Sequence, residues 1–373
     1  MEEWKSCKLG DVIKVLDYKR VPLSSKERAT RKGVYPYYGA QGIIDYLDDF
    51  IFDGEYLLIA EDGENLKSQK QNVAQIARGK YWVNNHAHVV ESDGKCDIRY
   101  ICYMLNSMDL SGYITGSAQP KLNQANLLAI KLSLPELAIQ KRIADILSTF
   151  DDKINLNNRI NHNLEKQIQE CFDSMIVSDN GLGYCQIADY VDVNPKRSIG
   201  KKVLAKCIDM SYLSTTGPFP SGWETKGYNG GMKFMNGDTI MARITPCLEN
   251  GKVAFVNFLD DGEVAFGSTE YIVLHSKEGV APEFTYFLAR NRDFVDYATK
   301  NMNGSSGRQR VSGDTIEKYM IPVIDSPSLD EFSSFAAPAM KVIRNNSFES
   351  RSLASTRDAL LPLLLSENPQ LRK

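Results

Sequence analysis

The sequence contains no apolar run that approaches the ~20 residues needed to cross a bilayer as a helix, so we expect no membrane-embedded segment. Residues 1–16 show no cationic segment followed by an apolar one, and they therefore predict no secretory signal. The seven cysteines are scattered and include no CxxC pair, which argues against a disulfide framework and against a zinc site. These absences predict a cytoplasmic protein.

Motifs of common catalytic sites are also missing. The sequence has neither a GxxxxGK[ST] phosphate loop nor a GxGxxG after a predicted strand, so it predicts no site for a nucleotide or for S-adenosylmethionine. "NPKR" at 194–197 lacks the second proline and the aromatic residue of an amino-methyltransferase tetrapeptide. His86 and His88 could form half a metal site, but packing explains them better. Glu249 and Lys252 are better explained by an Asn-Gly turn than by a nuclease site. We therefore expect no catalytic, cofactor-binding or metal-ligating residues.

Positive charge is concentrated in two stretches of the chain. The formal net charge is −3, which gives no overall attraction for a polyanion. Residues 19–32 nevertheless carry six cations against one glutamate, and residues 196–206 carry five cations against no acid. Each stretch is either a solvated loop or part of a strip that faces phosphates, and charge alone leaves both interpretations open.

The chain contains an internal duplication of roughly 180 to 190 residues. Paired segments share order, spacing and residue character: 10–20 with 188–197, 52–63 with 235–246, 81–91 with 264–275, 97–107 with 282–292, and 116–135 with 305–324. In each copy, β-branched runs bounded by Gly, Asn and Asp predict strands, while 98–107 and 283–290 predict short helices on a sheet. We expect an α+β fold with two mixed α/β domains in tandem.

A long helix is predicted after each domain. Residues 136–177 contain neither glycine nor proline, and such a helix would be about 60 Å long. Its apolar positions alternate three and four residues apart, as in a coiled coil, and the second copy repeats the pattern. We therefore expect the two helices to pair as an antiparallel coiled coil about a pseudo-twofold axis. The expected boundaries are 1–135 for the first domain, 136–180 for the first helix, 181–325 for the second domain and 326–373 for the second helix.

Polar residues interrupt both apolar seams at corresponding places. They are Asn157, Asn161, Asn346 and Ser350. An antiparallel register can place Asn157 by Ser350 and Asn161 by Asn346, with one mismatch, Phe150 against Arg357. A buried polar layer penalises every shifted register, in which an amide would face an aliphatic side chain. The alternative is that these asparagines face solvent on a slightly different seam.

Loops rich in glycine and amide side chains recur in both copies. "YPYYGAQG" (35–42), "GSAQPKLNQ" (116–124) and "NGSSGRQR" (303–310) offer the residue types that pair with base edges, because Arg and Lys suit guanine while Gln and Asn suit adenine. Two similar sets in a duplicated chain indicate two readers of nucleic acid. The candidate DNA-contacting residues are Lys19, Arg20, Tyr37, Gln41, Ser117, Gln119, Lys121, Lys196, Arg197, Arg243, Ser305, Arg308 and Arg310.

The chain resembles the specificity subunits of bacterial type I restriction-modification systems. "LPELAIQKRIADILSTFDDKI" (134–154) is similar to the helix that closes each target-recognition domain in that family, and residues 4–15 and 35–46 resemble the opening of such a domain. The two-copy plan extends the resemblance over essentially the whole chain. The second copy, at 325–343, departs from the pattern because it lacks the glutamine and because Pro338 should kink or delay the helix.

The resemblance implies separate roles for the two domains and the two helices. Each domain would read one part of a split sequence in double-stranded DNA, and the paired helices would set the distance between the parts. Two adenine methyltransferase subunits would dock on the chain, and ATP-driven restriction and translocase subunits would join through them. S-adenosylmethionine, ATP and Mg²⁺ would then belong to these partners, so that this chain is a non-catalytic, cytoplasmic subunit without a cofactor of its own.

Two other functions fit the sequence. The chain could be the recognition portion of a single-chain DNA methyltransferase or restriction enzyme, although no catalytic domain is evident in it. It could also be a coiled-coil scaffold that binds no nucleic acid, which the acidic net charge slightly favours. Affinity for duplex DNA in the presence of a methyltransferase partner separates a scaffold from a reader.

Overall fold

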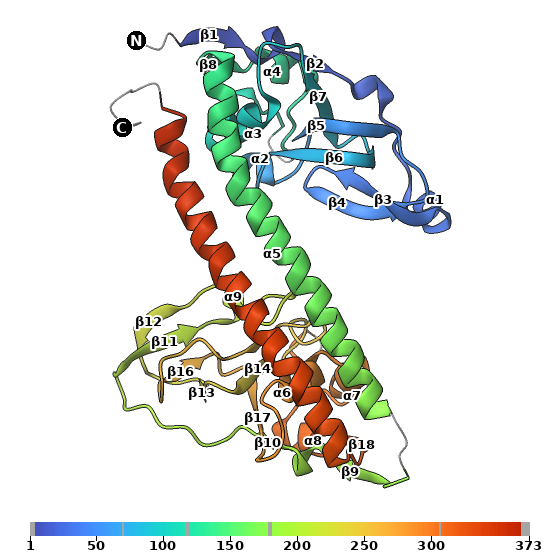
Figure 1. Ribbon diagram of the computed structural model, residues 1–373, viewed down its shortest axis with the longest axis vertical. Helices are drawn as coiled ribbons and strands as arrows, with labels where there is room; N and C mark the ends of the chain where they lie inside the picture. The colour runs from blue at the N-terminus through green and yellow to red at the C-terminus, as the bar shows by residue number, and fades with distance from the viewer. Residues whose placement is uncertain (1–3, 69–70, 117–118, 178–180, 306, 367–373) are drawn as a thin grey trace. The chain divides into compact units, whose positions relative to one another are not determined.

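The computed structural model describes residues 4–68, 71–116, 119–177, 181–305 and 307–366. The chain forms two compact units (Figure 1). Unit 1 comprises residues 1–153 and 352–373, and unit 2 comprises residues 154–351. Among the described residues, no helix is both long enough and apolar enough to span a membrane.

Unit 1 is built on a six-stranded sheet with the strand order β2-β7-β5-β6-β3-β4. Its strands are β2 (Ile13–Val15), β3 (Lys32–Gly39), β4 (Gly42–Leu47), β5 (Phe52–Ala60), β6 (Ala74–Val83) and β7 (Ala87–Ser92). Neighbouring strands are antiparallel except β3 and β6, which are parallel. A separate antiparallel pair joins β1 (Lys5–Lys8) to β8 (Lys131–Leu134). The predicted strand at 52–63 is therefore β5, and the segment 81–91 divides between β6 and β7.

Helices cover this sheet and complete the core of unit 1. The α-helices in its described part are α1 (Ser25–Thr30), α2 (Asn65–Ser68), α3 (Ile98–Ser107), α4 (Gln124–Ala129), the first part of α5 (Leu137–Val177) and the end of α9 (Ser326–Leu364). The predicted helix 98–107 is confirmed as α3, and its N-cap is Asp97, whose carboxylate accepts two backbone N–H groups of the first turn. Ile101 of α3, Leu147 of α5 and Leu57 of β5 belong to one buried core.

Unit 2 contains two four-stranded sheets, ordered β10-β17-β14-β15 and β12-β11-β16-β13, and a two-stranded sheet, β18-β9. The strands are β9 (Tyr184–Gln186), β10 (Val191–Val193), β11 (Leu204–Ile208), β12 (Glu224–Gly227), β13 (Lys233–Met235), β14 (Asp238–Ala242), β15 (Val253–Phe255), β16 (Val264–Gly267), β17 (Tyr271–Ser276) and β18 (Met320–Pro322). Short 3-10 helices in the two units lie at Leu9–Asp11, Asp17–Lys19, Ser111–Tyr113, Ile187–Asp189 and Met210–Tyr212.

The core of unit 2 is rich in aromatic side chains. Its α-helices are the second part of α5, α6 (Phe284–Arg290), α7 (Arg292–Lys300), α8 (Gly313–Glu317) and most of α9 (Ser326–Leu364). The ring of Phe172 on α5 lies 5.0 Å from that of Phe284 on α6 and 5.7 Å from that of Phe332 on α9. The predicted helix 283–290 is confirmed as α6. The Asn250–Gly251 turn lies between the paired strands β14 and β15, as expected.

The two units share one plan, as the internal duplication predicts. The strands β2-β7-β5-β6 of unit 1 have the same order and directions as β10-β17-β14-β15 of unit 2, and the pair β1-β8 corresponds to β9-β18. The units differ beyond these strands. In unit 1 the β3-β4 hairpin extends the main sheet, whereas unit 2 has a second four-stranded sheet.

The long helices pair as antiparallel neighbours with the predicted polar layer. In unit 2, the Asn157 side-chain amide donates to Ser350 Oγ at 3.2 Å, and the Asn346 amide donates to Asn161 Oδ1 at 2.9 Å. Asn157 is fully buried and Ser350 is 9% exposed, so these groups lie inside the helix pair. The predicted register is confirmed at both positions. The alternative of a solvent-facing position is wrong for Asn157, while Asn161 and Asn346 are half-buried.

The seam differs from the prediction near the end of α5. The three-and-four spacing continues the apolar seam through Cys171 and Met175, but these are only half-buried, and the buried positions are Phe172 and Ile176. The shift by one residue has a physical reason, because α5 packs at this end against α6 as well as α9. The buried residues of α5 at this end are therefore those on the side that faces both α6 and α9.

Two further expectations concern individual residues of the helices. Arg357 was expected opposite Phe150 as a mismatch, and its guanidinium forms an ion pair with the neighbouring Asp151, within unit 1. The expectation that Pro338 delays the second helix is wrong, because α9 begins at Ser326 and continues through the proline. Pro338 is exposed.

Candidate nucleic-acid interface

In unit 1, a loop from Thr115 to Lys121 is closed by its own backbone. Thr115 and Lys121 exchange two backbone hydrogen bonds, each 2.8 Å long. The loop lies beside the segment that follows β5, since the Leu122 N–H donates to the Glu61 carbonyl at 2.8 Å. Lys121 Nζ also lies 3.3 Å from the Glu61 carboxylate. Gln119 is exposed in this loop, and the candidate Ser117 lies outside the described residues.

A second candidate, Gln41 of the β3-β4 hairpin, contacts the same segment that follows β5. Gln41 is exposed at the hairpin turn, and its side-chain N–H donates to Asn65 Oδ1 at 3.4 Å. The Gly63 N–H donates to the carbonyl of Pro120, the residue that follows Gln119. The structure therefore brings Gln41 and the 115–121 loop to one side of unit 1, although they lie far apart in the sequence.

Unit 2 holds the corresponding loop in the same way. Asn303 and Arg310 exchange two backbone hydrogen bonds of 2.9 Å, and the Val311 N–H donates to the Arg243 carbonyl at 3.0 Å. Asn303, Arg310 and Val311 thus correspond to Thr115, Lys121 and Leu122, and Arg243 corresponds to Glu61. The candidates Ser305 and Arg308 are exposed within the loop.

Arg310 forms a fork-shaped ion pair with Glu270. Its Nε and Nη2 atoms lie 2.7–3.0 Å from the two carboxylate oxygens, and its Nη1 donates to the Arg308 carbonyl at 2.9 Å. These hydrogen bonds lower the pKa of Glu270 and raise the pKa of Arg310. The guanidinium of Arg310 is therefore occupied within the protein and fixes the shape of the loop.

Other candidates also have partners inside the units. Arg20 forms ion pairs with Asp17 at 3.1 Å and with Glu61 at 2.9 Å. Arg197 pairs at 2.9 Å with Asp238, whose side chain is fully buried. Tyr37 is 1% exposed and its hydroxyl accepts from the Leu23 N–H at 2.9 Å. These side chains support the fold, and their contact with DNA stays a prediction.

The histidines considered as half a metal site differ in surroundings. His88 is buried, and its ring together with the carboxylates of Asp17 and Glu61 places three ligand atoms within 4.8 Å of one another. Nothing in the sequence indicated that these two acids lie next to His88. The Arg20 guanidinium pairs with both carboxylates and Lys121 pairs with Glu61, so two cations offset the two negative charges. His86 is exposed and pairs separately with Asp62.

Both basic stretches, residues 19–32 and 196–206, contain exposed lysines. Lys19 is exposed, with its ammonium group 5.8 Å from the centre of the Tyr18 ring. Lys196, Lys201 and Lys202 are exposed in unit 2, and none of them forms an ion pair with another residue that the structure describes. These side chains are available to phosphate groups.

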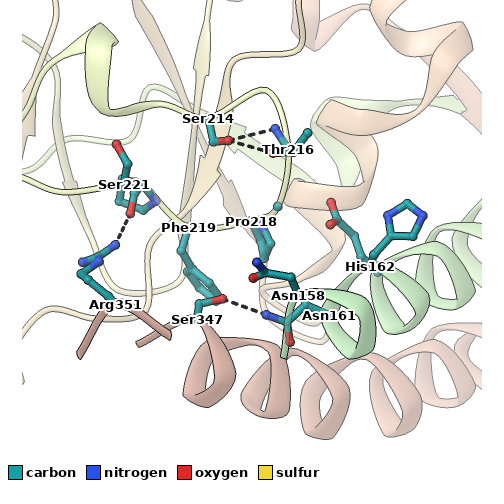
Figure 2. A pocket seen from close by; sticks show the side chains of 13 residues that line it. Asn158, Asn161, His162, Ser214, Thr216, Pro218, Phe219, Ser221, Ser347 and Arg351 are labelled. Atoms are coloured by element: carbon teal, nitrogen blue, oxygen red, sulfur yellow. Dashed lines mark hydrogen bonds between the residues drawn. The ribbon is translucent and has the colours of Figure 1, made fainter. Parts of the chain in front are cut away.

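Unit 2 also has a pocket of about 460 Å³ between α5, α9 and the segment 214–221 (Figure 2). Its polar lining is largely bonded within the protein. Asn161 donates to Ser347 at 3.2 Å, and Arg351 donates to the Pro220 carbonyl at 2.5 Å. Arg351 is the one lysine or arginine among the described residues that line it, and Glu165 lines it too. The charge of this pocket does not suit nucleic acid.

Comparisons with known proteins point to one family. Residues 1–166 match the family described as "Type I restriction modification DNA specificity domain". The chain is 37% identical over 145 residues to a putative type I restriction enzyme specificity subunit, S.HindORF215P, of Haemophilus influenzae, covering 39% of this chain and 36% of that protein. It is 32% identical over 154 residues to the EcoprrI specificity subunit of Escherichia coli, covering 41% of this chain and 37% of that one. The chain thus spans little more than a third of these relatives' lengths.

A solved structure is similar over nearly the whole chain. It is the crystal structure of the S subunit of a type I restriction-modification system from M. genitalium, with a TM-score of 0.64 and 13% sequence identity, covering 98% of this chain and 97% of that one. At this identity the likeness shows the fold, with two α/β domains and two long helices. The resemblance that the sequence indicates is confirmed by the match of residues 1–166 to the family of type I restriction modification DNA specificity domains.

Proposed function

We propose that this chain is the DNA-recognition subunit of a type I restriction-modification complex, with one part of a two-part DNA sequence read by each unit. Residues 1–135 and 181–325 form the two target-recognition domains. The segments 136–180 and 326–373, which contain α5 and α9, dock two methyltransferase subunits, through which restriction subunits join the complex. The subunit acts in the cytoplasm.

The observation that carries this proposal is the pair of corresponding loops. Both loops are closed by two backbone hydrogen bonds and attached to the segment that follows a central strand, at Glu61 in unit 1 and Arg243 in unit 2. Base edges are read by side chains that a rigid scaffold presents, while phosphate contacts hold the protein on the duplex. The exposed lysines 196, 201 and 202 supply such phosphate contacts.

We further propose that the chain performs no chemistry itself. S-adenosylmethionine, ATP and Mg²⁺ act in the partner subunits, and this chain contributes sequence recognition and positioning. The purified full-length chain, incubated with duplex DNA and labelled S-adenosylmethionine, is expected to transfer no methyl group. Methyl transfer by the chain alone would contradict this part of the proposal.

The recognition function is tested with a library of randomised duplex DNA. The full-length chain, alone and together with type I methyltransferase subunits, is mixed with the library, and the bound DNA is sequenced. We expect enrichment of a sequence with two defined parts separated by positions without preference. Enrichment of no sequence, with and without the partner, would contradict the proposal and favour a scaffold.

A further inference from the structure

The two loops correspond at their opening glycines and at the residues that lie against these glycines. Each opens with a glycine at positive φ, +83° at Gly116 and +129° at Gly304. A Cβ atom at Gly116 would lie 2.2 Å from the Gln119 carbonyl oxygen, and one at Gly304 would lie 3.0 Å from the Arg308 carbonyl oxygen. In each loop, the backbone of one later residue therefore lies against the opening glycine. That residue is Gln119 in unit 1 and Arg308 in unit 2, so these two residues correspond.

Two residues farther along, each loop has a cation that binds a carboxylate. Lys121 lies 3.3 Å from Glu61, and Arg310 forms its fork with Glu270. In Arg310 all three guanidinium nitrogens donate within the protein. These cations and carboxylates act as positioning residues, because they fix the loop instead of extending from it.

Gln119 and Arg308 differ from these positioning residues in their exposure and bonding. Both are exposed, and the side chain of neither forms a hydrogen bond or an ion pair with another residue in the part of the chain that the structure describes. A polar side chain that is presented by a fixed loop and has free donors can pair with a base edge in the major groove.

We propose, on the basis of the proposed function, that Gln119 and Arg308 are the equivalent specificity-determining residues of the two units. Gln119 recognises an adenine in the first half-site, and Arg308 recognises a guanine at the corresponding position of the second. The glutamine amide donates to adenine N7 and accepts from its N6 amino group, while the guanidinium donates twice to guanine O6 and N7. The two half-sites therefore differ at this position because one side chain differs.

Reciprocal substitution tests this assignment. The full-length variants Gln119→Arg and Arg308→Gln, and the double variant that exchanges the two residues, are taken through the randomised duplex selection beside the wild-type chain. The double variant keeps the net charge, which removes general attraction to phosphate as a cause. Thermal unfolding of each variant confirms that its fold is intact.

Control variants carry the same changes outside the loops. Gln186→Arg adds an exposed charge in β9, and Arg292→Gln removes an exposed arginine from α7. These controls are expected to keep the wild-type sequence preference at every position. If the controls altered the sequence preference as much as Gln119→Arg and Arg308→Gln do, the assignment would be overturned.

The expected result is a change at one position in each half-site. Gln119→Arg converts preference for adenine to guanine in the first half-site, and Arg308→Gln does the reverse in the second. Each substitution should lower affinity for the original base by roughly 5- to 150-fold. An unchanged motif, or a uniform loss of affinity that marks a phosphate contact, would overturn this inference while leaving the proposed function intact. If the wild-type chain enriches no sequence, the proposed function itself fails, and this inference with it.

Discussion

Asn346 on α9 donates its side-chain amide hydrogen to the amide oxygen of Asn161 on α5, at 2.9 Å. The neighbouring Asn157 donates to Ser350 from a fully buried position, but its own amide oxygen has no hydrogen-bond partner within the described residues. A buried polar atom without a partner costs about 1–3 kcal/mol. The polar layer therefore specifies the register of the helices at some expense of stability.

Replacing Asn157 and Asn161 with leucine is expected to raise the melting temperature or leave it unchanged. The leucines remove the unpaired oxygen and add apolar contact, but they no longer penalise shifted pairings. Thermal unfolding gives the stability, and light scattering during gel filtration detects new oligomers.

The matched control changes Asn155 and Asn163 to leucine, because both are exposed on the same helix. A marked loss of stability in the Asn157 and Asn161 variant, with unchanged oligomeric state, would show that these residues do not act through register.

The ion pair of Glu270 with Arg310 predicts a dependence of stability on pH. The pKa of Glu270 is lowered from 4.5 in the folded protein. Its contribution is therefore present above pH 4.5 and is lost as pH falls through the lowered pKa. Glu270→Gln should decrease the free energy of unfolding by about 0.5–1 kcal/mol at neutral pH, since solvent screens the pair. Urea denaturation should show this difference from wild type disappearing in strongly acidic solution.

Glu278→Gln is the control for this effect, because Glu278 is exposed in the same unit. It should leave the stability at neutral pH unchanged. A difference between Glu270→Gln and wild type that persists in strong acid would show that the ion pair is not its source.

Charge reversal of Lys196, Lys201 and Lys202 is expected to weaken binding to all duplex sequences. Each lost phosphate contact should reduce the slope of log K against log salt concentration by about 0.9. Titration of labelled duplexes at several salt concentrations measures both quantities. If affinity fell for one sequence only, these lysines would be reading bases.

Arg197 and Lys196 are neighbours in the sequence, but their substitutions should differ in effect. Arg197→Glu places a second carboxylate beside the buried Asp238 and should cost about 3–5 kcal/mol of folding stability. Lys196→Glu, at an exposed position, should change stability by less than about 0.5 kcal/mol. Chemical denaturation of the two variants distinguishes them, and equal effects would contradict the structural role of Arg197.

Much of the fold could be predicted from the sequence because it depends on periodic patterns. The absence of glycine and proline over 136–177 predicted α5, and the match of Asn157 with Ser350 predicted the register. The shift of the seam to Phe172 could not be predicted, because it depends on the packing of α6 against the same helix.

The candidate interface was harder to predict. Charge and residue type identified Arg20 and Arg310, but the sequence could not show that Glu61 and Glu270 are their partners. Those carboxylates lie 41 and 40 residues away in the chain, and only the strand order brings them close. Glu61 and Glu270 lie within the predicted strand segments 52–63 and 264–275, and this was the one available signal.

The measurement that tests the central claim most directly is a hydroxyl-radical footprint of the full-length chain, with its methyltransferase partner, on the enriched duplex. If each unit reads one part of the sequence, two protected regions should appear with unprotected base pairs between them, and charge reversal of Lys196, Lys201 and Lys202 should weaken protection of the second region first. A single continuous protected region, or equal loss of both regions in that variant, would contradict the claim that the two units read separate parts of the DNA.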